Sequence, residues 1–167
     1  AASLRAFASP RFVVPRLSPL AFVRAAHVWL GVSLAMLVAG PFWSRLVGLP
    51  FSHAWHGATR HAITVGFVSL MIVGVASRVA PRPPGSSADA EAMPLAPFVL
   101  LNLGCTLRVT QQVLTDLTPV AFPTAGVSGL LEVSGLVWWA TWIVPRLLAA
   151  SRPQGGRVGV APGAARV

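Results

Sequence analysis

The sequence predicts an all-α integral membrane protein, a four-helix bundle whose N and C termini both face the cytoplasm. Three observations support this prediction. Four long apolar segments are separated by short polar or proline-containing stretches. Hydrophobic residues make up 54% of the chain and charged residues only 10%, which excludes an ordinary soluble domain. Finally, the basic residues gather on one side of the predicted membrane.

The four apolar segments are long enough to cross a bilayer. A hydrocarbon core of roughly 30 Å requires about 20 helical residues. Backbone amides find no water in lipid, so helices, which pair these groups internally, are expected. The predicted helices cover about 20–42, 56–79, 93–116 and 122–148, within a transmembrane domain at 20–150.

The first and second predicted helices are almost free of charge. Arg24 and Arg45 bracket twenty residues whose only ionisable member is His27. His61 stands at the start of the second apolar run, and residues 62–77 carry no charge. Because charged groups are costly in hydrocarbon, both segments suit a bilayer.

The third and fourth predicted helices each carry one charge. Arg108 interrupts the third helix and Glu132 the fourth. Three further polar residues share one face of the third helix with Arg108, at helical spacing: Gln111, Gln112 and Thr115. Lipid would not tolerate that face, so we expect it to point into the bundle or toward a partner.

All thirteen basic residues are arginines, and their placement sets the predicted topology. Ten lie on the side of the termini, whereas Arg45 and Arg60 lie on the other side. By the positive-inside rule, the termini and the 80–93 loop face the cytoplasm, and the 44–56 and 116–123 loops face outward. The net charge of +9 would also suit nucleic acid, but anionic lipid explains it, so no nucleic-acid partner is expected.

Three segments outside the spans are predicted to lack regular structure. Residues 1–19 form an Arg- and Pro-rich cytoplasmic segment in which three prolines break any continuous helix. Residues 81–94 form a Pro, Ser and acidic linker, and 151–167 form a flexible tail. Cys105 is the only cysteine, so it cannot form an internal disulfide and is expected to be a small apolar filler.

Histidines crowd at the start of the second span. Neutral imidazole is the commonest protein ligand of haem and metals, so His61 is a candidate haem ligand. His53 and His56 lie three residues apart, a spacing that can bind a metal together with His61. The alternative is that His53 and His56 belong to an aromatic belt at the interface, beside Trp43 and Trp55.

Depth along the helices decides which polar residues can meet. At 1.5 Å per residue, His61, Arg108 and Glu132 fall in one layer of the outer half of the bundle. Arg108 then either pairs with Glu132 and orients the helices, or contacts the propionates of a haem. His27 lies nearer the cytoplasmic side, at the depth of Asn102. A hydrogen bond to Asn102 and haem ligation are its two candidate roles.

The run His61-Ala-Ile-Thr-Val-Gly-Phe67, followed by Met71 and Ser77-Arg-Val79, resembles the histidine-led signature of the NnrS family. These are bacterial membrane proteins associated with haem, copper and nitric-oxide stress. Three further stretches resemble family helices in the same order: FVRAAHVW at 22–29, LNLGCTLRV at 101–109 and the segment 131–146. The likeness spans 22–146 and corresponds to the last third of a typical twelve-helix member.

The resemblance implies a multi-pass protein of the bacterial inner membrane that binds haem b, with copper as a second cofactor. His61 matches the histidine of the family motif, and Asn102 and Arg108 match the polar positions of the next helix, whereas His27 stands where an aromatic residue is expected. Together with the residues singled out by their position, the candidate cofactor-binding residues are His61, Arg60, Arg108 and His27. The candidate metal ligands, chosen by their spacing, are His53, His56 and His61. The chain departs from the family after Arg78, where a glycine- and histidine-bearing turn is replaced by Ala80-Pro-Arg-Pro-Pro84. Any role of that turn is therefore lost.

Three functions remain open. The first is a haem-binding, NnrS-like protein of redox chemistry or nitric-oxide response, acting in electron transport. The second is a non-catalytic accessory subunit of a respiratory or photosynthetic membrane complex, whose partners are the bilayer and other membrane subunits. The third is a small transporter or channel that uses the polar face of the third helix. The absence of a nucleophile-base-acid grouping and of a Gly-rich phosphate loop disfavours a hydrolase.

Overall fold

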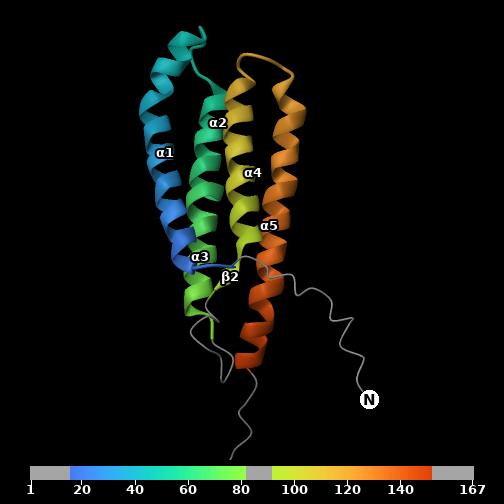
Figure 1. The fold of residues 1–167 in the computed structure, drawn as a ribbon. Helices are drawn as coiled ribbons and strands as arrows, with labels where there is room; N and C mark the ends of the chain where they lie inside the picture. Colours follow the sequence, from blue (N-terminus) through green and yellow to red (C-terminus); the bar gives the residue numbers. More distant parts are fainter. Residues whose placement is uncertain (1–15, 82–91, 152–167) are drawn as a thin grey trace, which may run out of the picture.

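The computed structural model describes residues 16–81 and 92–151, and its fold is helical, as predicted (Figure 1). The first helix is α1 (Pro19–Leu46). The second is a single rod, here called the α2–α3 helix, made of α2 (His53–His61), η1 (Ala62–Ser69) and α3 (Leu70–Val79). They are followed by α4 (Leu95–Leu114) and α5 (Ala121–Ala150). Most of the predicted N-terminal segment, the linker and the C-terminal tail fall outside the described residues.

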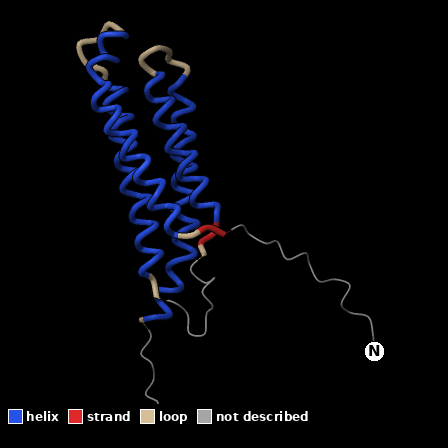
Figure 2. Tube along the Cα trace, turned by 60° about the vertical axis from the view of Figure 1, so that its left-hand side comes forward, coloured by secondary structure: helices blue, strands red, loops and turns tan. Residues whose placement is uncertain are grey.

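The four helices run up and down side by side in both views (Figures 1 and 2). The connections at 47–52 and 115–120 are short, and short connections favour antiparallel packing of the helices that they join. Arg16 and Ser151 therefore lie at the same end, which we call the proximal end. The opposite end, formed by residues 47–52 and 115–120, is called the distal end.

Local sequence signals set the ends of α1. Ser18 caps its N-terminus, where the hydroxyl accepts a hydrogen bond from the Leu20 amide, and Pro19 occupies the first turn. Both features are favoured at helix starts. Beyond Leu46 the chain turns at Gly48, whose φ of 71° lies in the left-handed region that glycine adopts most easily.

The middle of the α2–α3 helix is π-helical over η1, a feature that the sequence did not predict. Gly66 lies in this segment against the side chain of Trp29: a Cβ on Gly66 would stand 2.6 Å from the indole Cγ. The Ser69 hydroxyl donates to the carbonyl of Thr64, five residues earlier, at 3.1 Å. Long π-helical stretches are rare and often mark functional sites. This one begins directly after His61.

The helices α1, α2–α3 and α5 are each long and apolar enough to cross a membrane. In α1 and α5 only 22% of the most apolar window is buried, so the apolar residues face outward rather than into a core. Val38 and Leu130, for example, are 72% and 70% exposed. Such surfaces suit contact with a lipid bilayer. Among the described helices, α4 does not reach the same hydropathy, because it carries Asn102, Arg108 and two glutamines.

The core lies between the helices and is apolar. Phe22, Leu70, Leu101 and Cys105 are fully buried there, which confirms Cys105 as a small apolar filler. Two short strands close the proximal end: β1 (Arg16–Leu17) and β2 (Met93–Pro94), which pair antiparallel with Arg16 opposite Pro94. The sequence predicted no strand in either segment. Met93 of β2 is fully buried, so its side chain anchors the pairing.

Candidate functional site

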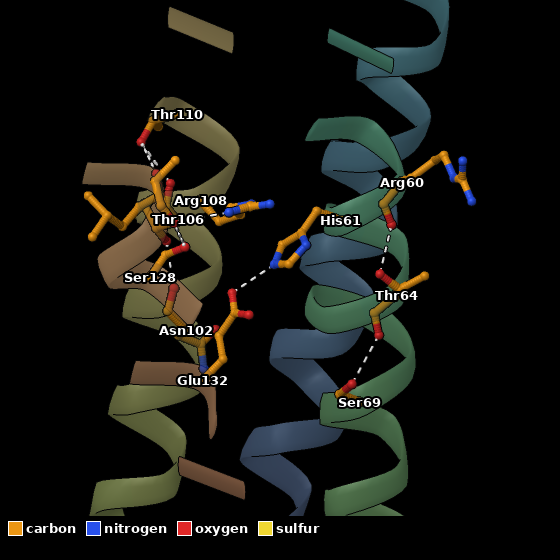
Figure 3. A network of polar contacts seen from close by, with 12 residues as sticks. Arg60, His61, Thr64, Ser69, Asn102, Thr106, Arg108, Thr110, Ser128 and Glu132 are labelled. Atoms are coloured by element: carbon orange, nitrogen blue, oxygen red, sulfur yellow. Dashed lines mark hydrogen bonds and ion pairs between the residues drawn. The ribbon is translucent and has the colours of Figure 1, made fainter. Parts of the chain in front are cut away.

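A partly buried hydrogen bond between His61 and Glu132 joins the end of α2 to the middle of α5 (Figure 3). The imidazole Nε2 lies 2.7 Å from the carboxylate Oε1, and the side chains are only 20% and 10% exposed. A carboxylate inside an apolar bundle is costly unless it has a partner. Of the predicted polar layer of His61, Arg108 and Glu132, the structure brings His61 and Glu132 together.

Close packing of α4 on α5 supports Glu132. A Cβ on Gly104 of α4 would lie 2.7 Å from Glu132 Cγ and 3.0 Å from the Ser128 carbonyl oxygen. Glycine at this position lets the two backbones approach, as small residues do in membrane helix pairs. The approach leaves Glu132 against α4 with its carboxylate turned toward His61.

Arg108 does not form the predicted ion pair with Glu132. Its Nη1 instead donates to the carbonyl of Ala125, at 3.1 Å. Ala125 precedes Glu132 by about two helical turns, so Arg108 reaches α5 nearer the distal end (Figure 3). The prediction placed the two residues at one depth, but in the structure it is Gly104 that contacts Glu132. Arg108 lies about one helical turn further toward the distal end, at the level of Ala125.

The polar face of α4 points into the bundle, as the sequence predicted. Besides the contact of Arg108, the side-chain oxygen of Gln111 accepts a hydrogen bond from the Thr124 hydroxyl at 3.0 Å. Both contacts join α4 to the first turns of α5. Among the buried polar side-chain atoms of the described residues, Nε of Arg108 is left without a hydrogen-bond partner.

The predicted hydrogen bond between His27 and Asn102 is absent. His27 Nδ1 donates to the carbonyl of Val23 on its own helix, at 2.8 Å, and the residue is exposed. Asn102 instead accepts a hydrogen bond from the indole Nε1 of Trp29, at 3.1 Å. Trp29 follows His27 by two residues, about 200° around a helix, so it faces the core while His27 faces outward.

His53, His56 and His61 are not brought together as a metal site. The rings of His53 and His56 both contact Phe51, with centroid distances of 4.9 and 5.6 Å. His61 is held by Glu132. Within residues 16–81 and 92–151, no group of three or more His, Cys, Asp or Glu side chains could hold a metal ion. The contacts of His53 and His56 agree with the aromatic-belt alternative, as does the stacking of Trp43 on Trp55 at 5.0 Å.

Arg60 precedes His61 but does not join its site. Its side chain is exposed and extends away from the pair of His61 and Glu132 (Figure 3). Successive helical residues point about 100° apart, which accounts for the difference. Of the two arginines proposed to neutralise a cofactor, only Arg108 extends toward the interior.

Asp116 was missed by sequence analysis. Its Oδ2 accepts hydrogen bonds from Trp43 Nε1, at 2.8 Å, and from the Ser52 hydroxyl. The carboxylate thereby joins the connection after α1 to the connection after α4. The only sequence signal was an acidic residue in a chain that has four. Its partners are 64 and 73 residues away, which no local pattern predicts.

The described geometry thus defines a class: a helical protein with membrane-type apolar helices and a partly buried histidine–carboxylate pair between them. Comparison with protein-family models, with curated proteins and with solved structures finds no match for the chain.

Proposed function

We propose that this chain is a haem-binding, NnrS-like membrane protein of bacterial redox or nitric-oxide response, with His61 as an axial ligand. The observation that carries the proposal is the 2.7 Å contact between His61 Nε2 and Glu132 Oε1. A histidine that binds a metal usually donates its other ring N–H to a carboxylate or carbonyl, which fixes the tautomer and the ring orientation. With Nε2 donating to Glu132, Nδ1 carries the free lone pair.

A single imidazole suits haem better than a metal bound by protein alone. The macrocycle supplies four ligands to its iron, so the protein adds only one or two. A structural zinc site needs four protein ligands and a catalytic one three. The described residues offer no group of three, so copper would need ligands from elsewhere. When bound, haem b would supply one-electron chemistry or gas binding.

Glu132 would be a positioning residue in this site. Its carboxylate holds the imidazole in one orientation and raises the electron density that the ring donates to a ligand. The apolar helices around the pair exclude water, so this hydrogen bond has little competition. Loss of Glu132 is expected to change the spectrum of a bound haem, whereas loss of His61 is expected to remove it.

The proposed topology has four membrane spans, cytoplasmic termini and the bacterial inner membrane as its location. The 20 residues of α4 cover roughly 30 Å at 1.5 Å per residue, enough to cross with its neighbours. Its arginine and Gln111 contact α5 rather than lipid. Four described arginines are placed toward the proximal end by helix order: Arg16, Arg24, Arg78 and Arg146. These four arginines outnumber the two at the distal end, Arg45 and Arg60, which supports a proximal end that faces the cytoplasm.

One observation favours a second candidate, an accessory subunit of a larger membrane complex. Trp138 is 47% exposed on α5 and lines a shallow pocket with Val133, Val137 and Thr141. Lipid or another subunit could cover it. A transporter has less support, because Arg108 and Gln111 are engaged in helix packing.

The test is a pyridine haemochrome and metal analysis of the purified full chain, before and after incubation with haemin. The haem-binding proposal predicts stoichiometric haem b and no stoichiometric copper. A chain that neither carries nor takes up haem contradicts it. Co-purification with large membrane subunits in that case would favour the accessory-subunit candidate.

A further inference from the structure

A groove opens near the distal end between α2, α4 and α5, on the far side of Arg108 from Glu132. Its volume of about 510 Å³ falls in the range of roughly 300–1,000 Å³ that is typical of small-molecule sites. Polar and apolar side chains both line it: His53, Ala54, Arg108, Gln112, Thr115, Asp116, Phe122, Ala125 and Gly126.

Arg108 is the cation of this groove, and its charge is not balanced in the described structure. Nη1 donates to a backbone carbonyl, and the buried Nε has no partner. Within the described ranges, the one ion pair is that of His61 with Glu132. A partly buried guanidinium without a counter-ion is less favourable than a paired one. An anion in the groove would supply the missing charge.

Asp116 also lines the groove but is engaged elsewhere. Its Oδ2 accepts from Trp43 and Ser52, which hold the carboxylate toward the connection between α1 and α2. It forms no ion pair with Arg108 in the described structure. The counter-ion of Arg108 therefore has to come from outside these residues.

The groove favours a small organic carboxylate. A guanidinium presents parallel N–H donors that match the two oxygens of a carboxylate. The Gln112 amide offers a further donor, and its side chain fits over Gly57 of α2, where a Cβ would stand 2.2 Å from Nε2. Phe122 and Ala125 provide apolar surface for the remainder of a ligand.

From these observations we propose that the Arg108 groove is a carboxylate-binding site. A free organic acid and a haem propionate share this chemistry. The site does not require haem, because Arg108 lacks a counter-ion in the described chain whether or not His61 binds iron.

The test is fluorine NMR of 4-fluorobenzoate with the haem-free full chain in detergent, compared with the neutral 4-fluorobenzyl alcohol. We expect saturable binding of the acid and at least about tenfold weaker binding of the alcohol, since charged hydrogen bonds discriminate strongly. Arg108→Gln should weaken binding of the acid by a similar factor. Equal binding of acid and alcohol, or an unchanged affinity in Arg108→Gln, overturns the proposal.

A second pair of variants covers the case in which Arg108→Gln does not fold. An added side chain at Gly126 or at Gly129 of α5 meets no atom within 4 Å at its Cβ, but only Gly126 lines the groove. Gly126→Leu should block 4-fluorobenzoate, whereas Gly129→Leu should bind it as the unmodified chain does. Equal binding by the two variants contradicts the site. If haem-loaded protein loses binding, a propionate is the native occupant; if it retains binding, a free acid is.

Discussion

In the described structure the side chain of Glu132 forms a hydrogen bond with one residue, His61. At the level of single residues, this partner was the hardest feature to predict. Depth along the helices placed both His61 and Arg108 within reach. In the structure, Glu132 forms a hydrogen bond with His61, and Arg108 donates to the Ala125 carbonyl. Depth can be counted from the sequence because the helical rise is fixed. The rotation of each helix and the direction of its side chains depend on how α4 packs on α5 at Gly104. The pattern of apolar residues along the sequence does not predict this contact.

A double-mutant cycle tests this pairing. The coupling between His61→Ala and Glu132→Ala should be on the order of 0.5–3 kcal/mol, because the two side chains are in contact. Arg108→Ala and Glu132→Ala should be additive within roughly 0.5 kcal/mol. The free energy of unfolding in detergent is the quantity to measure. A larger coupling of Glu132 with Arg108 than with His61 would contradict the observed pairing and support the ion pair that the sequence suggested.

Small residues decide how closely the helices approach, and their effect depends on the face they occupy. The sequence pairs Ala62 with Gly66 and Ala125 with Gly129 at the same four-residue spacing. Gly66 indeed packs against Trp29, but no atom lies within 4 Å of a Cβ built on Gly129. The same spacing therefore accompanies a close helix contact at Gly66 and open space at Gly129. The η1 segment was missed because its sequence has the same apolar character as an α-helix.

Gly66→Ala should destabilise the protein by about 1–3 kcal/mol, as overpacking of a core does. The Trp29 ring cannot simply move away, because its Nε1 donates to Asn102 at 3.1 Å. Gly129→Ala is the matched control and should be neutral or stabilising by up to about 1 kcal/mol, since alanine favours helix. Unfolding in detergent compares the two. Equal effects of both changes would mean that Gly66 is not at a close contact.

The order, number and approximate ends of the helices followed from the sequence because length and hydropathy are strong signals at the scale of the whole molecule. The helix predicted at 93–116 corresponds to α4 at Leu95–Leu114. The helix predicted at 122–148 corresponds to α5 at Ala121–Ala150. The contact between β1 and β2 was not foreseen, since Arg16 and Pro94 are far apart in sequence. Orientation in the membrane rests on arginine counts alone.

Cysteine labelling tests the orientation. In a Cys105→Ala background, Leu49→Cys lies at the distal end and Ser151→Cys at the proximal end, both exposed. A membrane-impermeant maleimide should label Leu49→Cys in intact cells and Ser151→Cys only after permeabilisation, because the proposed topology places the arginine-rich end in the cytoplasm. Labelling of Ser151→Cys in intact cells would reverse the proposed topology.

Haem binding through His61 is tested most directly by the Soret absorption of haem-reconstituted protein carrying His61→Ala. We predict that the band is lost while membrane insertion persists, since one imidazole contributes little to so apolar a span. His27→Ala, which removes an exposed ring bonded to its own helix, should leave the band unchanged. A Soret band that survives His61→Ala with its intensity and position intact would contradict the assignment of His61 as the axial ligand.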